Sequence, residues 1–313
     1  MWFCTNRSRC SAAIKRVQLL LLHCAPALPR HGYRRYPVKG GSTVSNRARF
    51  PASRSRVKNR ILSALTDEEY RNISRHLSFV ELKQGEVLFS EDNWIDYTYF
   101  MNSGMASSVS VTAEGQTVED GTVGLEGLLG GSAAFGECQI FCSVIVQIPG
   151  NAMRIGAQAL RYEAKYNPGF SKLLTDYLCN LRLQLNQSNE CHDLHSLEQR
   201  LCSLLLMCQD CARSSTFPFT IKFLSHTVGA TRAAVSIAAV SLHEAGLITY
   251  RRSWIRIMER EEMEHRACSC YRLCAHRYDQ PALLGNAGVV PLRLVVSGAA
   301  RNKSHPRSPR LPE

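Results

Sequence analysis

The pattern that most constrains this chain lies between Phe219 and Met258, where two helix-forming segments and a hairpin follow one another closely. Thr220 can cap the first helix, because a threonine side-chain oxygen accepts a free amide of the first turn. Gly229 supplies the tight turn between the helices, and Thr231 can cap the second. Apolar residues recur at helical spacing through both segments, at Phe223, Leu224, Val228, Val235, Ala238, Ala239 and Leu242.

A short hairpin completes the pattern. Gly246 ends the second helix, and residues 247–250 begin a strand. Residues 251–253 turn, and residues 254–257 return as a second strand. This order is typical of a winged helix-turn-helix, in which the second helix presents its N-terminal turn to the major groove of DNA. The segment is therefore expected to bind DNA.

Several segments resemble one known family. Residues 229–235 (GATRAAV) and 242–248 (LHEAGLI) are similar to the helix-turn-helix of Crp/Fnr-type bacterial transcription regulators. Residues 97–104 (YTYFMNSG) resemble a turn in the sensor barrel of that family, and residues 195–201 (HSLEQRL) resemble the helix that leads into its DNA-binding domain. The likeness runs from about Arg60 to about Asp279, roughly two thirds of the chain.

The resemblance implies an α+β fold with three parts. They are an N-terminal antiparallel β-barrel or jelly roll of the cyclic-nucleotide-binding type, a long dimerisation helix, and a C-terminal winged helix-turn-helix. We expect a basic, disordered arm before the barrel and a helical, then disordered extension after the last domain. The expected boundaries are 1–57 for the arm, 58–166 for the barrel, 167–193 for the helix, 194–264 for the DNA-binding domain and 265–313 for the extension. Because family members usually begin near Asn59, the arm could instead be sequence that is not part of the native product.

The net charge of +12 is unevenly distributed. Residues 1–66 hold 14 Lys and Arg and no acid, and residues 281–313 hold five bases and one acid. Residues 67–280 hold 19 bases and 25 acids, so the positive excess lies in the tails. Within that acidic body, residues 220–260 carry a net charge of +4, the local excess that contact with DNA phosphates requires.

The segment before residue 165 indicates a β-rich domain. Thr66 and Glu69 have the spacing of a helix capping box. Turns are expected at 102–104 and 149–151. Short strands at even spacing favour an antiparallel barrel or jelly roll. The expected strands are 87–89, 97–101, 107–112, 117–120 and 144–148.

A candidate effector pocket lies at Gly124, Glu126 and Gly127, where the resembling family carries a phosphate-cradling loop. There the glycines would let the backbone approach an anion, and Glu126 would accept hydrogen bonds from a ribose. The family's cyclic-nucleotide binders also need a downstream arginine, yet this chain has no Lys or Arg from Gly127 to Met153. Because a buried phosphate without a cation is costly, we expect a barrel that does not bind cyclic AMP. An ordinary barrel turn and a pocket for another, unidentified effector stay open.

A long helix is expected to begin at Asn167-Pro168. It could pack on its own barrel or pair with a second copy of the chain. We expect a homodimer, because helix-turn-helix proteins commonly dimerise to place two recognition helices about 34–36 Å apart on a palindromic operator. The apolar stripe that would mediate the pairing recurs every three or four residues and includes Leu174, Leu178, Leu181 and Leu185.

The 13 cysteines are an odd number, which argues against a complete disulfide framework. Those in 208–211 and 268–274 form the tight groups, both in segments with helical patterns. Together they could offer four sulfurs to zinc, but they are much further apart than in a usual zinc knuckle. Cys4, Cys10 and Cys24 lack the close clustering of the family's iron–sulfur members. We therefore expect free thiols, with no metal and no cofactor.

Two other function classes fit parts of the sequence. A ligand- or redox-responsive module that regulates a protein partner would not need the helix-turn-helix or its basic charge. A thiol oxidoreductase using Cys208 and Cys211 would need a βαβ context, whereas the surrounding pattern is helical. No paired carboxylates and no Ser/His/Asp arrangement stand out, so the chain is not expected to be an enzyme.

The second helix of the motif carries the residues expected to contact DNA bases, namely Arg232, Ala233, Ser236 and Ile237. Arg232 matches the family position that reaches O6 and N7 of a guanine. Ala233 and Ile237 replace an acid and a second arginine of better-known members, and they could contact a thymine methyl instead. The residues expected at the DNA backbone are Thr220, Lys222, Thr231, Arg251 and Arg252.

The expected partners are double-stranded DNA and a second copy of the chain, with RNA polymerase as a further candidate. The longest early apolar run, Val17 to Leu22, is too short to span a bilayer. We therefore expect a cytoplasmic protein without a membrane span.

Overall fold

The computed structural model describes residues 54–111, 117–136 and 139–273. All of these residues belong to one compact unit, within Asn46–Glu313. The expected arm as far as residue 53, its three cysteines and the expected extension beyond residue 273 lie outside the described residues.

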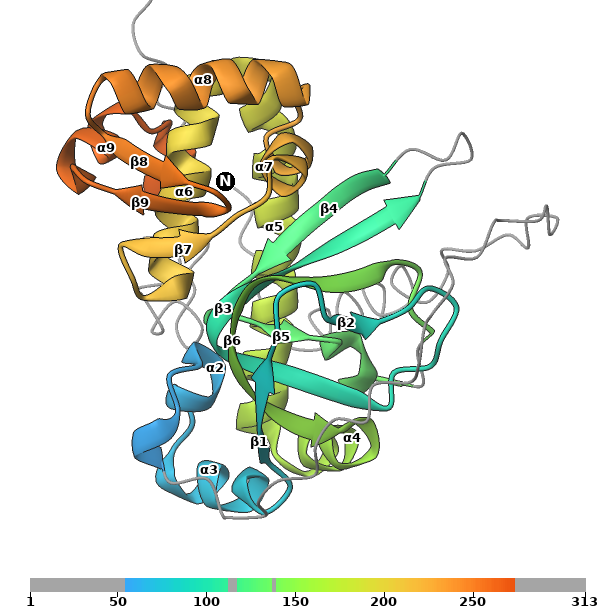
Figure 1. Cartoon of the computed structure of the whole chain (residues 1–313). Coiled ribbons are helices and arrows are strands. Elements are labelled where there is room, and N and C mark those ends of the chain that lie inside the picture. The colour runs from blue at the N-terminus through green and yellow to red at the C-terminus, as the bar shows by residue number, and fades with distance from the viewer. Residues whose placement is uncertain (1–53, 112–116, 137–138, 274–313) are drawn as a thin grey trace, which may run out of the picture. The chain divides into compact units, whose positions relative to one another are not determined.

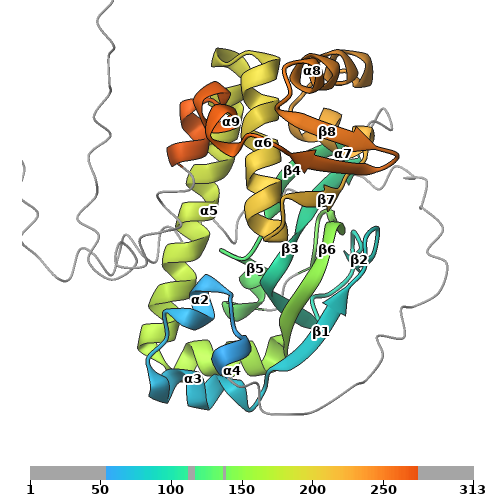
Figure 2. The ribbon, with the colours of Figure 1, turned by 60° about the vertical axis from the view of Figure 1, so that its left-hand side comes forward.

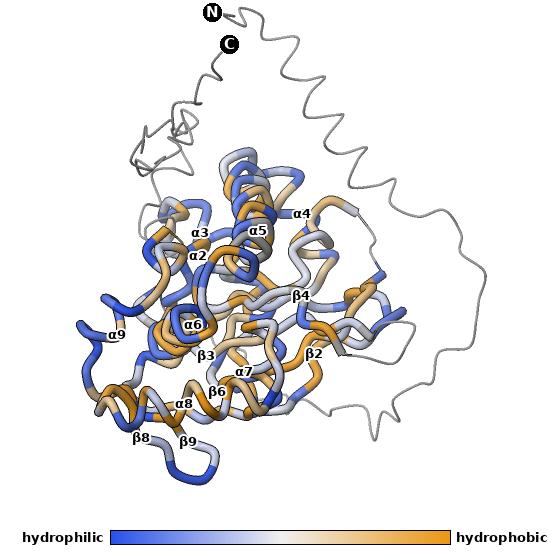
Figure 3. Tube along the Cα trace, turned by 90° about the horizontal axis from the view of Figure 1, so that it is seen from above, coloured by the Kyte–Doolittle hydropathy of each residue, from blue (hydrophilic) through white to orange (hydrophobic). Residues whose placement is uncertain are grey.

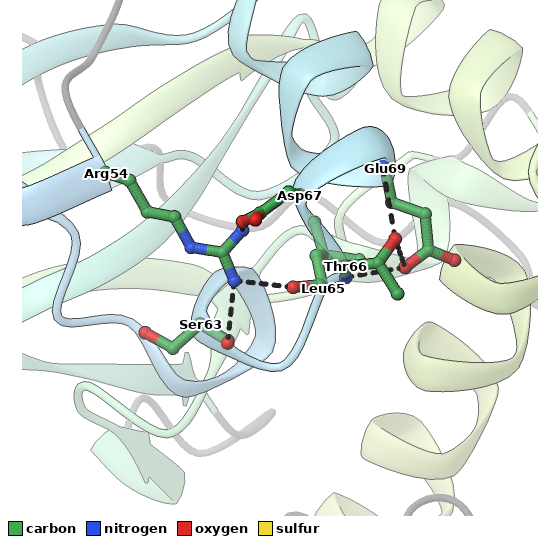
Figure 4. Close-up of polar contacts among 6 residues, drawn as sticks. All are labelled: Arg54, Ser63, Leu65, Thr66, Asp67 and Glu69. Atoms are coloured by element: carbon green, nitrogen blue, oxygen red, sulfur yellow. Dashed lines mark hydrogen bonds and ion pairs between the residues drawn. The ribbon is translucent and has the colours of Figure 1, made fainter.

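The described part begins with a short 3-10 helix, η1 (Arg54–Arg56), and two α-helices, α2 (Arg60–Ser63) and α3 (Asp67–Ser74). The capping box that begins α3 is confirmed: Thr66 Oγ1 accepts from the Glu69 amide at 3.3 Å, and Glu69 accepts from the Thr66 amide at 2.8 Å (Figure 4). Arg54 donates to Asp67 and to the Leu65 carbonyl, both at 2.6 Å. These bonds tie Arg54, which lies within the arm expected at 1–57, to the start of α3.

Within the described residues, six antiparallel strands form the N-terminal domain (Figure 1). The hydrogen-bonded order is β1-β6-β3-β4, with β2 paired to β6 and β5 paired to β3. This arrangement confirms the expected antiparallel β domain. The strand bounds are β1 (Ser78–Leu82), β2 (Val87–Phe89), β3 (Tyr97–Val111), β4 (Thr117–Val123), β5 (Leu128–Leu129) and β6 (Ser143–Gly156).

The turns expected at 102–104 and 149–151 are wrong, because each lies inside a long strand. The register of β3 against β6 shifts between Met101 and Ala106, so the ladder bulges and bends there without ending. Gly104 has a φ of +81°, and a Cβ on it would lie 2.6 Å from the Ile148 carbonyl oxygen. A Cβ on Gly150 would meet the Ser103 carbonyl oxygen even more closely. Glycines at these positions therefore allow two bent strands to cross, where the sequence pattern suggested two turns.

Two helices follow the sheet, α4 (Ala157–Tyr166) and α5 (Pro168–Leu194). The Asn167 side chain caps α5 by accepting from the Phe170 amide at 3.0 Å, and Pro168 is its first residue, as expected. Figure 2 shows α5 running along the β domain. Its buried Phe170 joins Phe100 and Met153 of the strands in one hydrophobic core.

As far as residue 273, the C-terminal part contains four helices and a small sheet, and a second hydrophobic core lies among them. A capping box of Ser196 and Gln199 begins α6. Strand order in the sheet is β7-β9-β8, so the predicted hairpin gains a third strand that the sequence did not reveal. The bounds are α6 (Leu197–Ala212), β7 (Thr216–Pro218), α7 (Ile221–Thr227), α8 (Arg232–Glu244), β8 (Ile248–Arg251), β9 (Trp254–Ile257) and α9 (Arg260–Arg266).

That second core includes Met263, Ala267 and Tyr271. The boundary expected at 264 therefore cuts through α9, and packing of the domain continues to about residue 271. Among the described residues, no single helix is long and apolar enough to cross a membrane; only the bent pair α7–α8 would be so by length and composition together.

Candidate nucleic-acid interface

The helices α7 and α8 meet at the expected glycine turn. Gly229 has a φ of +62°, a conformation that side-chain-bearing residues rarely adopt. Thr220 Oγ1 accepts from the Phe223 amide at 3.0 Å, and Thr231 Oγ1 accepts from the Ala234 amide at 3.2 Å. Each cap leaves its hydroxyl hydrogen available as a donor, so a threonine that begins a helix can also bind a phosphate oxygen.

One face of α8 is buried and the opposite face is exposed. Val235, Ala239 and Leu242 lie in the core, whereas the four expected base-contacting residues are exposed. Ile237 is 72% exposed, and Val240, one helical turn further, is 41% exposed. Val240 was not among the residues predicted to contact bases, although its spacing of three from Ile237 places it on the same face. Figure 3 shows most of α8 in the white-to-orange range of hydropathy.

The expected phosphate-contacting side chains are also exposed. Lys222 lies on α7, and Arg251 ends β8 at the tip of the hairpin, where it pairs with Trp254. Arg252 in the turn has a φ of +57°. Figure 3 shows this turn as a hydrophilic loop beyond β8 and β9. Arginines at the end of a hairpin can reach a DNA backbone without entering a groove.

The electrostatics of His226 link α7 to α8. Its pKa lies below the ordinary value, first because burial disfavours the charged ring, and then because of Lys222 and Arg232. These two side chains therefore lie close enough to the same imidazole to repel its proton. The two candidate DNA-binding cations thus form one local region of positive potential across the helix-turn-helix.

Arg260 is one of the positively charged residues counted in 220–260, and it is already neutralised by acidic neighbours. Arg260 donates to Asp210 at 2.9 Å and to Glu264 at 2.8 Å, and it also bonds Gln209 and Tyr271. The local excess of positive charge is therefore smaller than the sequence sum suggested. Arg260 joins α9 to α6 and belongs to the structure of the domain.

The loop proposed as an effector pocket already uses its own donors. The Gly124 amide donates to Glu126 Oε1 at 2.7 Å, and the Gly127 amide donates to the Gly124 carbonyl at 3.0 Å. The Asn59 side chain donates to the carbonyls of Leu125 and Gly127 in this loop. Burial raises the pKa of Glu126. The amides of Gly124 and Gly127, which would help to cradle a phosphate, are thus engaged within the loop.

The apolar stripe of α5 divides into two groups. Leu174 is 1% exposed and lies in the core of the N-terminal domain, so it is a residue of the chain's own packing and not of a dimer contact. Leu178, Leu181 and Leu185 are only partly buried in a single chain, and Leu178 and Leu181 also pack against the edge of that core. The N-terminal end of the stripe therefore packs on the barrel of the same chain. The sequence could not show this, because the same apolar spacing suits packing within one chain and pairing with a second copy.

The two cysteine groups do not come together as the zinc hypothesis required. Cys208 and Cys211 are buried on α6, and burial raises the pKa of both thiols. A nucleophilic or redox-active cysteine needs the opposite shift, so this pair is poorly suited to a thiol oxidoreductase. Cys268 and Cys270 lie beside the end of α5, near Cys191.

Two family models match the sequence. A model of the cyclic nucleotide-binding domain matches residues 79–167, and a model of the Crp-like helix-turn-helix domain matches residues 199–266. The first match covers the strands of the N-terminal domain and α4, and the second covers α6 to α9 with their small sheet. Both predicted domains are therefore confirmed.

Solved structures share the fold at low sequence identity. FixK2 from Bradyrhizobium japonicum has a TM-score of 0.52 and 15% identity, covering 62% of this chain and 98% of that one. A CRP-family transcriptional regulator from Thermus thermophilus gives 0.50 and 14%, covering 60% and 95%. CLP of Xanthomonas campestris, described as a c-di-GMP responsive global regulator, gives 0.50 and 13%, covering 62% and 100%. No curated protein matches the sequence significantly.

Proposed function

We infer that this chain, a member of the Crp/Fnr superfamily of DNA-binding transcription regulators, acts as a homodimer on a palindromic operator. The observation that carries this proposal is the exposed N-terminal turn of α8, where Arg232 projects beside the helix-turn-helix cap Thr231. A guanidinium there is suited to bond O6 and N7 of one guanine. On the same exposed face, Ala233, Ile237 and Val240 are apolar and suit thymine methyl groups, whereas Ser236 is polar.

The backbone contacts would come from both sides of α8. Lys222 lies on the helix before it, and Arg251 and Arg252 lie at the hairpin beyond it. Contacts on two sides fix the register of the helix in the groove, whereas base specificity comes from α8 itself. Thr220 and Thr231 can add hydroxyl donors at the N-termini of their helices.

Dimerisation through α5 would supply the symmetry of the operator. Leu178, Leu181 and Leu185 are partly exposed in one chain, and a second copy of the same helix would cover them. Two recognition helices related by a two-fold axis bind half-sites about one helical turn of DNA apart.

For the sensor domain we propose an effector other than cyclic AMP. The engaged amides of Gly124 and Gly127 and the lack of Lys and Arg from Gly127 to Met153 support this. CLP has a similar fold and is described as responding to c-di-GMP, so the fold does not by itself require cyclic AMP. Titration calorimetry with cyclic AMP should detect no binding, and submicromolar affinity would overturn this part of the proposal.

Selection of bound sequences from random DNA by the full chain tests the main proposal. We expect enrichment of a two-fold symmetric site with half-sites about 10–10.5 base pairs apart, centre to centre. Arg232→Ala should relax the preference at one base of each half-site, while Arg71→Ala, on the exposed surface of α3, should select the same site as the unmodified chain. Selection of an unrelated, asymmetric sequence would contradict the dimer model.

The location follows from the proposed partner. A regulator of this kind acts where the chromosome is accessible, which in a bacterial cell is the cytoplasm. RNA polymerase is a further proposed partner, and pull-down by the DNA-bound chain would test that contact.

A further inference from the structure

Four side chains of the types that bind soft metals meet where α5 ends. Cys191 lies in the last turn of α5, and His195 is its C-cap. Cys268 and Cys270 come from the segment that follows α9. All four ligand atoms lie within 4.8 Å of one another. This group brings together two chain segments that are separated by more than 70 residues.

The distances fit a tetrahedral ion. With zinc–sulfur bonds of about 2.3 Å and zinc–nitrogen bonds of about 2.0–2.1 Å, tetrahedral ligands lie about 3.8 Å apart for two sulfurs and about 3.6 Å apart for sulfur and nitrogen. Cys191 Sγ lies 3.5 Å from Cys268 Sγ, and Cys270 Sγ lies 3.7 Å from His195 Nδ1. Small side-chain movements would place all four atoms around one ion.

Neighbouring polar groups support the cluster from outside. Ser203 Oγ on α6 lies 3.0 Å from Cys268 Sγ and accepts the Cys268 amide at 3.1 Å. Gln187 Nε2 on α5 donates to Cys270 Sγ at 3.4 Å. Groups in such positions orient metal ligands in proteins. Two of the four ligands are also buried, as suits a structural metal site: Cys268 is 2% and Cys270 is 7% exposed.

A disulfide between Cys191 and Cys268 is the main alternative explanation. It would account for one of the short distances and leave the approach of His195 to Cys270 unexplained. Three thiols and one imidazole are instead a donor set that structural zinc sites use.

We propose that Cys191, His195, Cys268 and Cys270 bind one Zn²⁺ ion in a closed, four-coordinate site. The protein supplies all four ligands, so no position is left for a substrate, and the site is structural. It joins the end of α5 to the segment after α9 across the start of α6.

The position of the site gives it a mechanical consequence. Next to Cys191, the His192 ring bonds the Thr227 carbonyl through Nε2 at 3.1 Å, and it lies beside Gly229 in the helix-turn-helix turn. Zinc would therefore fix the helix end that contacts the DNA-binding motif. This consequence rests on the proposed DNA-binding function, whereas metal binding itself does not.

Metal analysis and cobalt substitution of the purified full chain test the site. We expect about one zinc ion per chain and, after exchange, the visible bands of tetrahedral Co²⁺ with thiolate charge-transfer bands. Cys191→Ser and Cys270→Ser should lose the ion. Cys179→Ser, on the exposed surface of α5, and Cys211→Ser, in the core, are matched controls that should retain it.

Two further variants keep the test informative if a serine variant fails to fold. Cys191→His preserves four ligands, so it should bind Co²⁺ with about two thirds of the thiolate charge-transfer intensity. Ser203→Ala should weaken zinc binding about 10- to 100-fold, because it removes an outer hydrogen bond to Cys268.

Three results would overturn the proposal. One is a full chain without stoichiometric metal that does not take up Co²⁺. Another is a Cys191–Cys268 disulfide found by mass spectrometry in the freshly isolated, unreduced protein. The third is several iron and sulfide ions per chain, which would indicate a cluster. Retained DNA binding after removal of zinc would reject only the mechanical consequence, and it would leave the metal site intact.

Discussion

At the scale of single residues, Arg232 and Arg251 are both exposed cations with different expected roles. Arg232→Ala should weaken operator binding by about 1–3 kcal/mol per half-site, because one guanine loses a bidentate contact. Binding to random DNA should change much less. Competition binding with the selected operator and with scrambled DNA measures both quantities.

Arg251→Ala is the matched comparison for that experiment. Loss of a phosphate contact should weaken operator and random DNA by similar factors. The assignment of roles fails if both variants lose operator and random DNA to the same extent.

His226 gives a prediction about pH. Its folded-state pKa lies below the ordinary 6.5, through burial and then through Lys222 and Arg232, so the unfolded chain binds this proton more tightly. The contribution to folding stability is therefore complete above about pH 6.5 and is lost as pH falls through the folded-state pKa. Denaturant unfolding at several pH values measures the free energy of unfolding. As pH falls, this free energy should decline less steeply for His226→Gln than for the unmodified chain. A decline of unchanged steepness would show that other groups cause it.

At the scale of elements, α8 should have two functionally distinct faces. Leu242→Ala should destabilise the fold by about 2–5 kcal/mol, because Leu242 is fully buried. Ile237→Ala should change stability by less than about 0.5 kcal/mol, since Ile237 is 72% exposed, and it should weaken operator binding by about 1 kcal/mol. Thermal unfolding and operator binding separate the two effects. Destabilisation by Ile237→Ala comparable to that of Leu242→Ala would contradict the assigned faces.

The helix α5 allows a similar comparison for the dimer. Leu185 is partly buried, and Leu183, two residues earlier, points to the other side of the helix and is 48% exposed. Leu185→Glu should shift the chain from dimer to monomer in sedimentation at micromolar concentration, and Leu183→Glu should not. Because Leu185 also lies against Gly121, thermal unfolding of both variants must accompany the measurement. A dimer that survives Leu185→Glu would place the interface elsewhere.

At the scale of the whole molecule, two chains together should contribute about six phosphate contacts through Lys222, Arg251 and Arg252. The logarithm of the binding constant should then fall with the logarithm of salt concentration with a slope of about −5. Arg251→Ala in both chains should reduce the magnitude of that slope by about 1.8. Arg71→Ala removes one charge from the surface of α3 and should leave the slope unchanged.

The sequence by itself determined the elements whose signals are local. Thr66, Thr220 and Thr231 mark helix starts because a cap involves residues only three positions apart. Gly229 marks the turn because its backbone conformation is restricted for other residues. The same locality misled the interpretation of residues 102–104 and 149–151, since glycine allows a close crossing of strands as well as a turn.

Only the tertiary structure decided which distant residues meet. Leu174 faces its own barrel, Arg260 is neutralised by Asp210, and the loop at 124–127 is held by bonds from its own amides and by Asn59, which donates to two of its carbonyls. Most notably, Cys268 and Cys270 gather with Cys191 and His195, and not with Cys208 and Cys211 as the zinc hypothesis required. Helical periodicity and residue spacing report on neighbours along the chain, whereas these contacts join segments tens of residues apart and leave no periodic pattern in the sequence.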